Sequence, residues 1–228
     1  MTAGGGGPGI ELAGEWFEPL AEKALWWPSE GTLLVADAHV GKAVSFRSLG
    51  VPVPRGTTSE NLSRLGVLVE RHAARRIVFL GDFLHSRRAH APATLSALAR
   101  WRALHPRLEL TLVRGNHDDR AGDPPEALGV QVVDEPLRER GLLLCHHPRP
   151  HVAGYVLAGH VHPGLALGDG RFGRLRLPCF HFGEQVGVLP AFGSFTGLQM
   201  VAPAPRDRVF VVAGDEVREM PARALPSC

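Results

Sequence analysis

Residues 76–80 (RIVFL) form an apolar run of strand length, and Gly81 and Asp82 follow it directly. Residues 32–36 (TLLVA) and residues 108–113 (LELTLV) repeat this pattern of an apolar run that ends near polar residues. Short continuous apolar runs are typical of strands buried on both faces, as in a parallel sheet. We therefore predict three buried strands, each with polar side chains at its carboxyl end.

Two amphipathic segments separate these strands. Ser59 is a good N-cap residue, and Leu62, Leu65 and Val69 follow it at helical spacing. Residues 92–104 begin with a proline, which favours the first turn of a helix. The resulting β-α-β-α-β order implies a mostly parallel sheet with helices packed on it.

The pattern changes after residue 130, where short apolar runs alternate with turns that contain Gly or Pro. The runs are Leu142–Cys145, Tyr155–Ala158, Arg174–Leu177, Val186–Leu189 and Val209–Val212. They favour a second, more antiparallel sheet. The expected fold class is α/β, with two sheets and flanking helices in a single domain over residues 10–228. Residues 1–9 are Gly-rich and poor in apolar side chains, so we expect a disordered tail there.

Composition limits the class of protein. The formal net charge of +2 over 228 residues gives no strong global field, so any nucleic-acid site would be a local patch. The three cysteines form no CxxC pair, which favours a reducing, cytoplasmic setting. No stretch approaches the roughly 18 apolar residues of a membrane span, and the chain starts with no basic-then-apolar signal pattern. We therefore expect a protein of the cytoplasm rather than of a membrane.

Polar clusters follow five of the predicted strands. They are Asp37-Ala38-His39, Gly81-Asp82, Gly115-Asn116-His117-Asp118, Cys145-His146-His147-Pro148 and Gly159-His160-Val161-His162. Each one alone is compatible with an ordinary turn. Ligands in open α/β sheets bind at the carboxyl ends of strands, so five clusters in this position predict one shared site.

The residue types in these clusters favour a site for two divalent metals. Carboxylate and imidazole ligands without thiolate suit Mn²⁺, our first expectation, with Zn²⁺ or Fe as alternatives. Two cations about 3.5–4 Å apart need a bridging carboxylate, and Asp82 is the natural bridge. Glycine stands directly before Asp82, Asn116 and His160, where it lets the backbone turn sharply and leaves room at the metals.

Together these motifs resemble those of the calcineurin-like metallophosphoesterases. The resemblance runs from about residue 32 to 163 and rests on Asp37-x-His39, Gly81-Asp82-x-x-His85, Gly115-Asn116-His117-Asp118, His146 and Gly159-His160-x-His162. The chain also resembles, more narrowly, the small bacterial phosphoesterases associated with a DNA-repair ligase. That likeness rests on Gly41-Lys42-x-x-x-Phe46-Arg47-x-x-Gly50, His146-His147-Pro148 and Leu189-Pro190-Ala191-Phe192-Gly193.

The family resemblance implies a two-sheet metallophosphoesterase sandwich and a ligand set for each metal. One metal would take Asp37, His39, Asp82 and His162, and the other would take Asp82, Asn116, His146 and His160. His117 would be the non-ligand imidazole that stabilises the transition state or protonates the leaving oxygen, with Asp118 orienting it. His85 stands where relatives carry either Asp or His.

The expected activity is two-metal hydrolysis of a phosphodiester by attack of a metal-bound water. The narrower resemblance implies DNA as the substrate and a DNA-repair ligase as an associated protein. Candidate substrate-binding residues are Lys42, Arg47, Arg149 and His85. The first two, with Arg55, lie in an expected loop over residues 40–58, for which a merely solvated loop is the alternative.

Other activities and roles stay open at this point. The enzyme alternatives are a small-molecule nucleotide phosphoesterase or a phosphatase, and the alternative of another class is an inactive protein-binding scaffold. Alternation along a strand would point His147 away from the site. Surface roles are expected for His72, His90 and His105, a place near the site is open for His151 and His181, and core packing is expected for Cys145.

Overall fold

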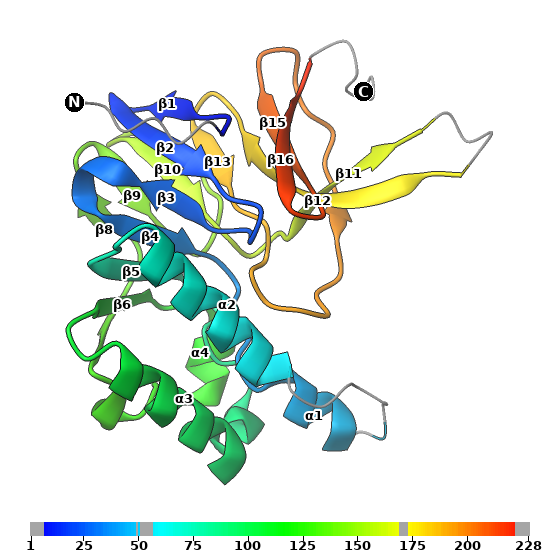
Figure 1. Cartoon of the computed structure of the whole chain (residues 1–228). Coiled ribbons are helices and arrows are strands. Elements are labelled where there is room, and N and C mark those ends of the chain that lie inside the picture. Colours follow the sequence, from blue (N-terminus) through cyan, green and yellow to red (C-terminus); the bar gives the residue numbers. More distant parts are fainter. Residues whose placement is uncertain (1–6, 49, 51–56, 169–172, 222–228) are drawn as a thin grey trace.

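The computed structural model describes residues 7–48, 50, 57–168 and 173–221. Its strands form one seven-stranded and one nine-stranded sheet, and the longer helices lie on one side of the seven-stranded sheet (Figure 1). This is the expected α/β sandwich of two sheets flanked by helices. Residues 1–6 of the expected tail and Arg55 of the expected loop lie outside the described residues.

The seven-stranded sheet holds its strands in chain order. They are β1 (Ile10–Leu12), β2 (Glu15–Pro19), β3 (Leu25–Trp27), β4 (Thr32–Val35), β5 (Arg76–Leu80), β6 (Glu109–Val113) and β7 (Val130–Val133). Strands β1 to β4 pair antiparallel, and strands β4 to β7 pair parallel. The three predicted strands are therefore confirmed as β4, β5 and β6, in the predicted parallel arrangement.

The nine-stranded sheet comes from the second half of the chain. Its strands are β8 (Leu137–Glu139), β9 (Leu142–Leu144), β10 (Tyr155–Ala158), β11 (Pro163–Leu167), β12 (Leu175–Phe182), β13 (Val186–Val188), β14 (Gln199–Met200), β15 (Arg208–Ala213) and β16 (Glu216–Met220). Within the described ranges, five of its strand pairs are antiparallel and three are parallel. The prediction of a more antiparallel second half is confirmed.

The helices lie between the strands of the first sheet. The described ones are α1 (Lys42–Ser48), α2 (Thr57–Arg71), α3 (Pro92–Leu104) and α4 (Asn116–Ala121), with 3-10 turns η1 (Pro28–Glu30), η2 (Arg87–His90) and η3 (Glu126–Leu128). Helices α2 and α3 correspond to the two predicted helices. In the described part of the chain, no helix is long and apolar enough to cross a membrane.

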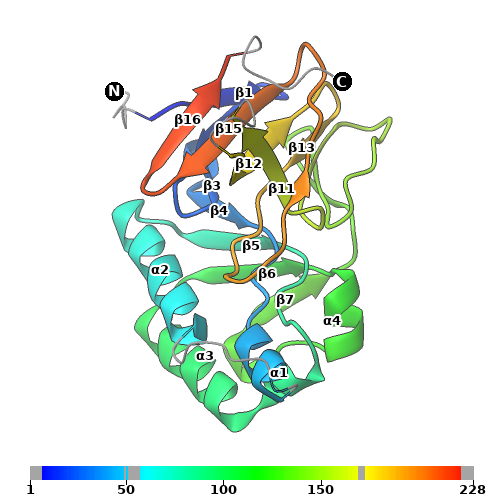
Figure 2. The same cartoon turned by 90° about the vertical axis from the view of Figure 1, so that its right-hand side faces the viewer.

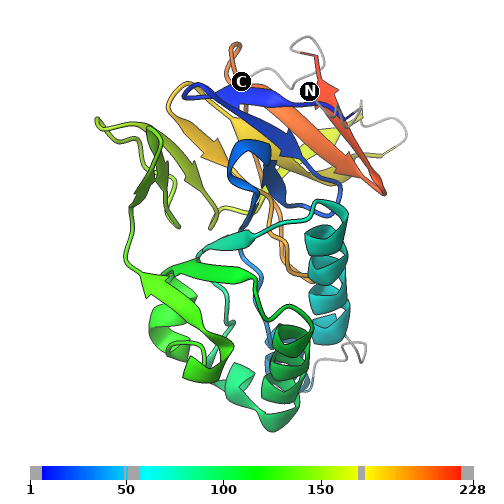
Figure 3. The same cartoon turned by 60° about the vertical axis from the view of Figure 1, so that its left-hand side comes forward.

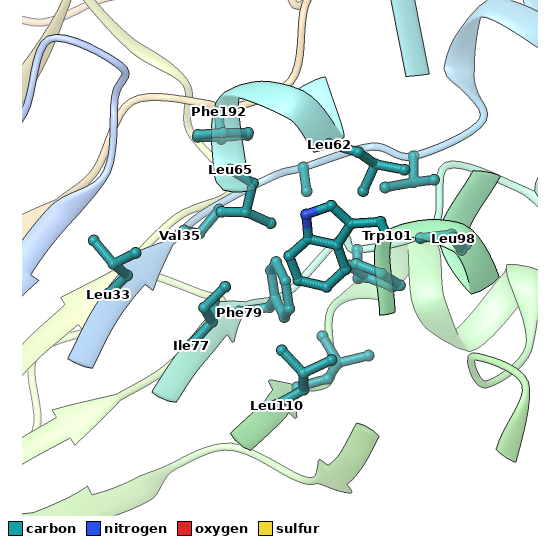
Figure 4. Close-up of a cluster of buried hydrophobic side chains, with 14 of the residues drawn as sticks. Leu33, Val35, Leu62, Leu65, Ile77, Phe79, Leu98, Trp101, Leu110 and Phe192 are labelled. Carbon is teal, nitrogen blue, oxygen red and sulfur yellow. The ribbon is translucent and has the colours of Figure 1, made fainter. Parts of the chain in front are cut away.

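The apolar strands bury both faces, which explains their continuous hydrophobic runs. On β5, Ile77 and Phe79 face the helices, where they pack with Leu65 of α2 and Trp101 of α3 (Figure 4). Val78 and Leu80 face the other sheet and share a core with its strands, represented by Phe180 and Phe210. Burying both faces removes more apolar surface from water than an amphipathic strand could, and this burial is the main force that joins the layers.

The N-terminal strands extend the interface between the sheets. Ile10 and Phe17 belong to the same buried cluster as Phe182 and Phe210. Figure 3 shows the blue β1 and β2 beside the orange and red β15–β16 hairpin, and Arg208 donates a hydrogen bond of 3.1 Å to the carbonyl of Gly9 there. No expectation covered these strands, because each is too short to give a clear periodic pattern.

Two short helices were not predicted, and one of them replaces part of an expected loop. Residues 42–48, expected within a loop, form α1, where Ala43 and Ser45 are buried. Asn116, which the sequence places only after a strand, begins a helix that was not predicted, α4. Both helices have seven residues or fewer, so they span too few turns to show a hydrophobic repeat, and packing against neighbouring elements stabilises them instead.

Candidate metal centre

Backbone hydrogen bonds bring the first two polar clusters together. The amide of Asp37 donates to the carbonyl of Gly81 at 3.3 Å, and the amide of His39 donates to the carbonyl of Asp82 at 2.9 Å. These bonds continue the parallel pairing of β4 with β5 past the ends of both strands. The carboxyl edge of the sheet therefore brings Asp37 and Asp82 together, with ligand atoms within 4.8 Å of each other. Helices α1 and α4 lie beyond the same edge of the sheet (Figure 2).

One group of candidate ligands consists of Asp37, His39 and His162. Their ligand atoms lie within 4.8 Å of one another, and Nε2 of His162 is 3.5 Å from Oδ1 of Asp37. Asp37 and His39 are buried, yet Oδ1 of Asp37 and Nδ1 of His39 have no hydrogen-bond partner among the described residues. Buried polar atoms without a partner are rare in folded proteins, and a bound cation would satisfy both atoms.

A second group surrounds Nε2 of His146. This atom lies 3.0 Å from Oδ1 of Asn116, 3.0 Å from Nδ1 of His160 and 3.5 Å from Oδ1 of Asp82. Nδ1 of His146 is 3.0 Å from the carbonyl oxygen of Leu80, so the proton of a neutral ring lies on Nδ1. Nε2 therefore carries a lone pair and faces the lone pairs of the Asn116 and Asp82 oxygens, an arrangement that suits a cation.

The two groups are connected. Asp37, Asp82 and His146 also have ligand atoms within 4.8 Å of one another, and all three are buried. The donor set of carboxylate, imidazole and amide oxygen fits divalent metal ions. All seven residues expected as ligands lie in these two groups, with Asp82 between them as the expected bridge.

The backbone of the site is strained. Five of the ten described non-glycine residues with positive φ are candidate ligands, namely Asp37 (51°), His39 (45°), Asp82 (52°), His160 (69°) and His162 (55°). A left-handed conformation costs a non-glycine residue of order 1–3 kcal/mol, and such strain gathers at functional sites. Here it turns successive side chains towards one point instead of letting them alternate along a strand.

Glycines allow the close packing of the ligands. A Cβ atom added to Gly115 would lie 2.5 Å from Oδ1 of Asp82, and one added to Gly159 would lie 2.6 Å from Oδ2 of Asp37. At Gly81, a Cβ would lie 2.1 Å from Nδ1 of His146. The glycines that precede candidate ligands in the sequence therefore make room for ligands of other loops.

Burial keeps the central imidazole of the site neutral. It lowers the pKa of His39 from 6.5 to about 2, and nearby Lys42 and His162 act in the same direction. Burial also lowers the pKa of His85 to about 4, with Lys42 and His117 adding to the shift. A neutral imidazole keeps a lone pair, which metal coordination requires.

His117 lies beside the ligands and is oriented by the backbone. Its Nδ1 is 2.8 Å from the carbonyl oxygen of His85, and its Nε2 is 3.9 Å from Oδ2 of Asp82. The ring of His85 stacks on it with centroids 5.1 Å apart. Since a carbonyl oxygen only accepts, Nδ1 of His117 carries a proton and Nε2 faces the metal ligands.

The expectation that Asp118 orients His117 does not match these contacts. Asp118 is fully buried, and its carboxylate accepts hydrogen bonds of 3.0 Å from the amides of Leu84 and Gly115. Burial raises its pKa to about 6, against the opposing effect of those amides. Neighbouring residues of α4 point in different directions, so Asp118 supports the two loops while His117 faces the site.

His147 faces the site, contrary to expectation. Its ring lies 4.7 Å from that of His160, and His146, His147 and His160 form a group with ligand atoms within 4.8 Å of one another. Strand β9 ends at Leu144, so the alternation of a strand does not apply to residues 146 and 147. His147 is therefore an additional candidate ligand.

Glu135 is a site residue that the sequence did not reveal. Its carboxylate accepts hydrogen bonds from the amides of His146 and His147 at 2.7 and 2.9 Å. It also lies 2.8 Å from Nδ1 of His147. A carboxylate on one nitrogen of an imidazole directs the lone pair of the other nitrogen outward, which is the common support for a metal-binding histidine. No sequence motif identifies Glu135 as a site residue, because a single Glu before a proline is not a recognisable pattern.

The expected substrate-binding residues lie at different distances from the centre. Burial lowers the pKa of Lys42, while Asp37 and Asp82 oppose that shift, so its ammonium lies in the field of the site carboxylates. His85 contacts both His39 and His117. Arg47 is exposed on α1, and Arg149 is exposed two residues after His147. Lys42 and His85 thus lie at the site, and the two arginines lie on the surface near its loops.

The remaining histidines lie elsewhere among the described residues. The rings of His72 and His105 pack on tryptophans, and His90 contacts the carbonyl of Ala121. His181 pairs with Asp207, and His151 accepts from the amide of Ala153. None of these five belongs to the ligand groups found in the described ranges. Cys145 is buried as expected, Cys179 is also free and buried, and Cys228 lies outside the described residues.

Comparison with solved structures gives a strong match. The nuclease MPE of Pseudomonas putida is 46% identical, with a TM-score of 0.83 over 93% of this chain and 99% of the other. Yfce, a phosphoesterase from E. coli, is 14% identical, with a TM-score of 0.42 over 86% of this chain and 99% of the other. No family model matches the chain. No curated protein matches it either.

Proposed function

The chain belongs to the metallophosphoesterase family and is a metal-dependent phosphoesterase, and from this premise we propose that it is a two-metal phosphodiesterase acting on DNA. One observation carries the proposal: two groups of carboxylate, imidazole and amide ligands meet at Asp37, Asp82 and His146. Asp37, His39, Asp82 and His162 would hold one cation, and Asp82, Asn116, His146 and His160 the other. His147 is close enough to contribute to the second.

The bound cations would neutralise charge on the phosphate and lower the pKa of a bound water towards neutrality. The protein provides the geometry for this chemistry. Asp82 receives a hydrogen bond of 2.8 Å from the amide of His117, which fixes the carboxylate between the two ligand groups. The amide of His160 donates at 2.9 Å to Oδ2 of Asp37 and thereby fixes the second carboxylate. These bonds hold the ligands in place before a substrate arrives.

His117 would act on the leaving oxygen. With Nδ1–H held by the carbonyl of His85, a protonated ring presents Nε2–H towards the metal ligands, 3.9 Å from Oδ2 of Asp82. Donation of that proton as the ester bond breaks prevents the build-up of an alkoxide. General acid catalysis of this kind contributes about 10²–10⁴ to the rate.

Two observations favour DNA as the substrate. The 46% identical relative is a nuclease, and the match extends over nearly the full length of both chains. The ammonium of Lys42 lies near the carboxylates of the site, where it could contact a phosphate oxygen. A small-molecule phosphatase would instead need contacts that enclose a single substrate, and an inactive scaffold would not need the strained ligand backbone.

Hydrolysis assays test the proposal directly. Metal-stripped protein with added Mn²⁺ would be given an aryl phosphodiester, the matching monoester and a single-stranded oligonucleotide. Metal-dependent cleavage of the diester and of the oligonucleotide is the expected result. Preference for the monoester would replace the proposal with a phosphatase. Absence of turnover on all three, with both metals bound, would favour the scaffold.

Association with a DNA-repair ligase is a separate proposal from the narrower family resemblance. Co-purification of the tagged chain with a ligase from its own host tests it, with the untagged chain as the control. The ligase is expected to co-purify with the tagged chain and to be absent from the untagged control. Recovery of an equal amount of ligase without the tag would remove the proposal.

A further inference from the structure

A basic pocket adjoins His117 at the edge of the candidate metal centre. It has a volume of about 430 Å³ and is lined by His85, Ser86, Arg87, Arg88, His117 and Arg120. Two of its lining residues, His85 and His117, thus belong to the reaction centre, and three are arginines from η2 and α4. These two elements follow β5 and β6, whose carboxyl ends supply the metal ligands, and hydrogen bonds hold them against each other.

The three arginines of the pocket have no acidic partner among the described residues. Six other described arginines do pair with carboxylates, in Arg71–Glu22, Arg76–Glu139, Arg114–Asp123, Arg140–Glu30, Arg208–Glu219 and Arg218–Glu216. Among the described residues, no ion pair involves Arg87, Arg88 or Arg120. Three unpaired cations around one pocket repel one another, and an anion in the pocket would relieve that repulsion.

The pocket is held in shape by contacts between its two elements. Nε of Arg87 donates a hydrogen bond of 3.2 Å to the carbonyl of Arg120, and the ring of His90 lies 3.2 Å from the carbonyl of Ala121. Ala89 of η2 packs tightly against Gly41, where an added Cβ would lie only 2.6 Å away. These contacts therefore hold in place the backbone segments that carry the arginines, which reduces the entropic cost of binding an anion.

We propose that Arg88 and Arg120, with Arg87, bind the phosphate next to the scissile one on the leaving-group side of a nucleic-acid strand. This inference rests on the proposed phosphodiesterase function. His117 lines both the reaction centre and the pocket, and it would protonate the leaving oxygen. The strand that continues beyond that oxygen must therefore pass His117, and its next phosphate would reach the arginines. A guanidinium group suits this ligand because it can donate two parallel hydrogen bonds to a phosphate.

The test compares variants on substrates with and without a neighbouring phosphate. Arg88→Ala/Arg120→Ala is the main variant, because neither side chain forms a hydrogen bond among the described residues. The side chain of Arg87, by contrast, also donates a hydrogen bond to the backbone of α4. Arg107→Ala is the matched control, since Arg107 is exposed before β6, at the opposite end of the sheet. The substrates are an aryl phosphodiester, a dinucleoside monophosphate and a single-stranded oligonucleotide.

For the double variant, kcat/KM on the oligonucleotide is expected to fall about tenfold or more, as for a lost phosphate contact. Both single-phosphate substrates should stay within about twofold of wild type. The slope of log(kcat/KM) against log[salt] should flatten by about 0.7 for each lost contact with a single strand. Arg88→Lys/Arg120→Lys should keep most of that slope, because lysine retains the charge.

Assays of the wild-type protein distinguish failure of the DNA proposal from failure of the pocket proposal. If wild type cleaves the aryl diester but neither nucleic-acid substrate, the DNA proposal fails, and the pocket loses its assigned ligand with it. If wild type cleaves the oligonucleotide and the double variant matches it in rate and salt slope, the pocket proposal alone is overturned. An equal loss on all three substrates would also overturn it, because the arginines would then act on the reaction centre itself.

Discussion

Nδ1 of His117 lies 2.8 Å from the carbonyl oxygen of His85, so a backbone carbonyl fixes the imidazole that faces the metal ligands. The two residues follow different strands, β6 and β5, which pair in parallel. The contact thus links two neighbouring strand ends. A carbonyl can only accept a hydrogen bond, and this leaves Nε2 of His117 as the atom available for proton transfer.

His117→Ala should retain the metals and lose turnover. His117 shares a group of ligand atoms with His39 and His85 but belongs to none that holds Asp37, Asp82 or His146, so those three ligands should keep their geometry. We expect kcat on a phosphodiester with a poor leaving group to fall by about 10²–10⁴. The loss should be smaller on an aryl diester, whose leaving group needs no proton. His151→Ala, an exposed histidine, is the control, and loss of metal from His117→Ala would contradict this role.

Gly115→Ala should disrupt the metal centre without changing any candidate ligand. The φ of Gly115 is −107°, an ordinary value for alanine, but the new Cβ would lie 2.5 Å from Oδ1 and from the amide nitrogen of Asp82. Asp82 must then move, and we expect Mn²⁺ content to drop by more than half, as measured by elemental analysis. Gly197→Ala is the matched control, because nothing lies within 4 Å of its added Cβ. Full metal content in Gly115→Ala would argue against Asp82 as the bridge.

Glu135→Gln should change the tautomer of His147. The oxygen of the new amide can still accept from the two backbone amides, but its NH₂ group would then face Nδ1 of His147. Nδ1 would become an acceptor and Nε2 would take the proton, so Nε2 could no longer bind a metal. Changes in such supporting carboxylates typically weaken metal binding about 10–100-fold. Glu139→Gln, which removes a carboxylate paired with Arg76, is the control.

A titration of metal affinity decides the outcome for Glu135→Gln. Weakened binding of one of the two Mn²⁺ ions, with the other unchanged, is expected if His147 helps to hold the second metal. Unchanged affinities for both ions would show that Glu135 only orders the backbone of residues 146 and 147.

Asp118→Ala should lower stability more than it lowers the chemical rate. The change leaves the amides of Leu84 and Gly115 without a partner, and each buried unsatisfied donor costs about 1–3 kcal/mol. Urea unfolding of the metal-free protein measures the loss. In the folded variant, kcat should stay within about tenfold of wild type. A kcat loss as large as that of His117→Ala, with little change in stability, would restore a catalytic role to Asp118.

The metal-free protein should lose stability as the pH falls from about 6.5 towards 4. The pKa of His39 is lowered to about 2 and that of His85 to about 4 in the folded state, both from 6.5. The unfolded chain therefore binds more protons in this range, so the free energy of unfolding decreases with falling pH. Asp118 acts in the opposite direction below about pH 6, because its pKa is raised from 3.8.

The variant His85→Asn tests this linkage. It should show a shallower fall of the urea midpoint between about pH 6.5 and 4, since one of the two depressed imidazoles is gone. His151→Asn, at an exposed position, should follow wild type. An unchanged slope in His85→Asn would show that protonation of His85 does not oppose folding.

Much of the fold was predictable from local patterns. Strands β4, β5 and β6 are continuous apolar runs that are buried on both faces. Helix α2 has apolar residues at helical spacing, and α3 begins with a proline, so these helices could also be recognised from the sequence. Helices α1 and α4 and strands β1 to β3 contain too few residues to show a periodic pattern of apolar side chains. Contacts with distant segments stabilise these elements, and no window of sequence contains those contacts.

The candidate ligands were also predictable, because their types and spacing are local properties. Asp37, His39 and Asp82 follow strands whose β-α-β order predicts parallel pairing, and parallel strands bring their carboxyl ends to one edge of the sheet. The orientation of the ligands was not predictable. It depends on left-handed backbone at five ligand positions, which the surrounding packing imposes.

The sequence by itself determined the layered α/β fold, the family and the set of chemical groups at the site. Hydrophobic period and residue type are carried within short segments, and they suffice for those conclusions. Only the tertiary structure decided that His85 rather than Asp118 orients His117, that Glu135 supports His147, and that unpaired arginines gather beside the site. Each of these relations joins residues from separate loops, and their distances arise only when both sheets and the helices pack together.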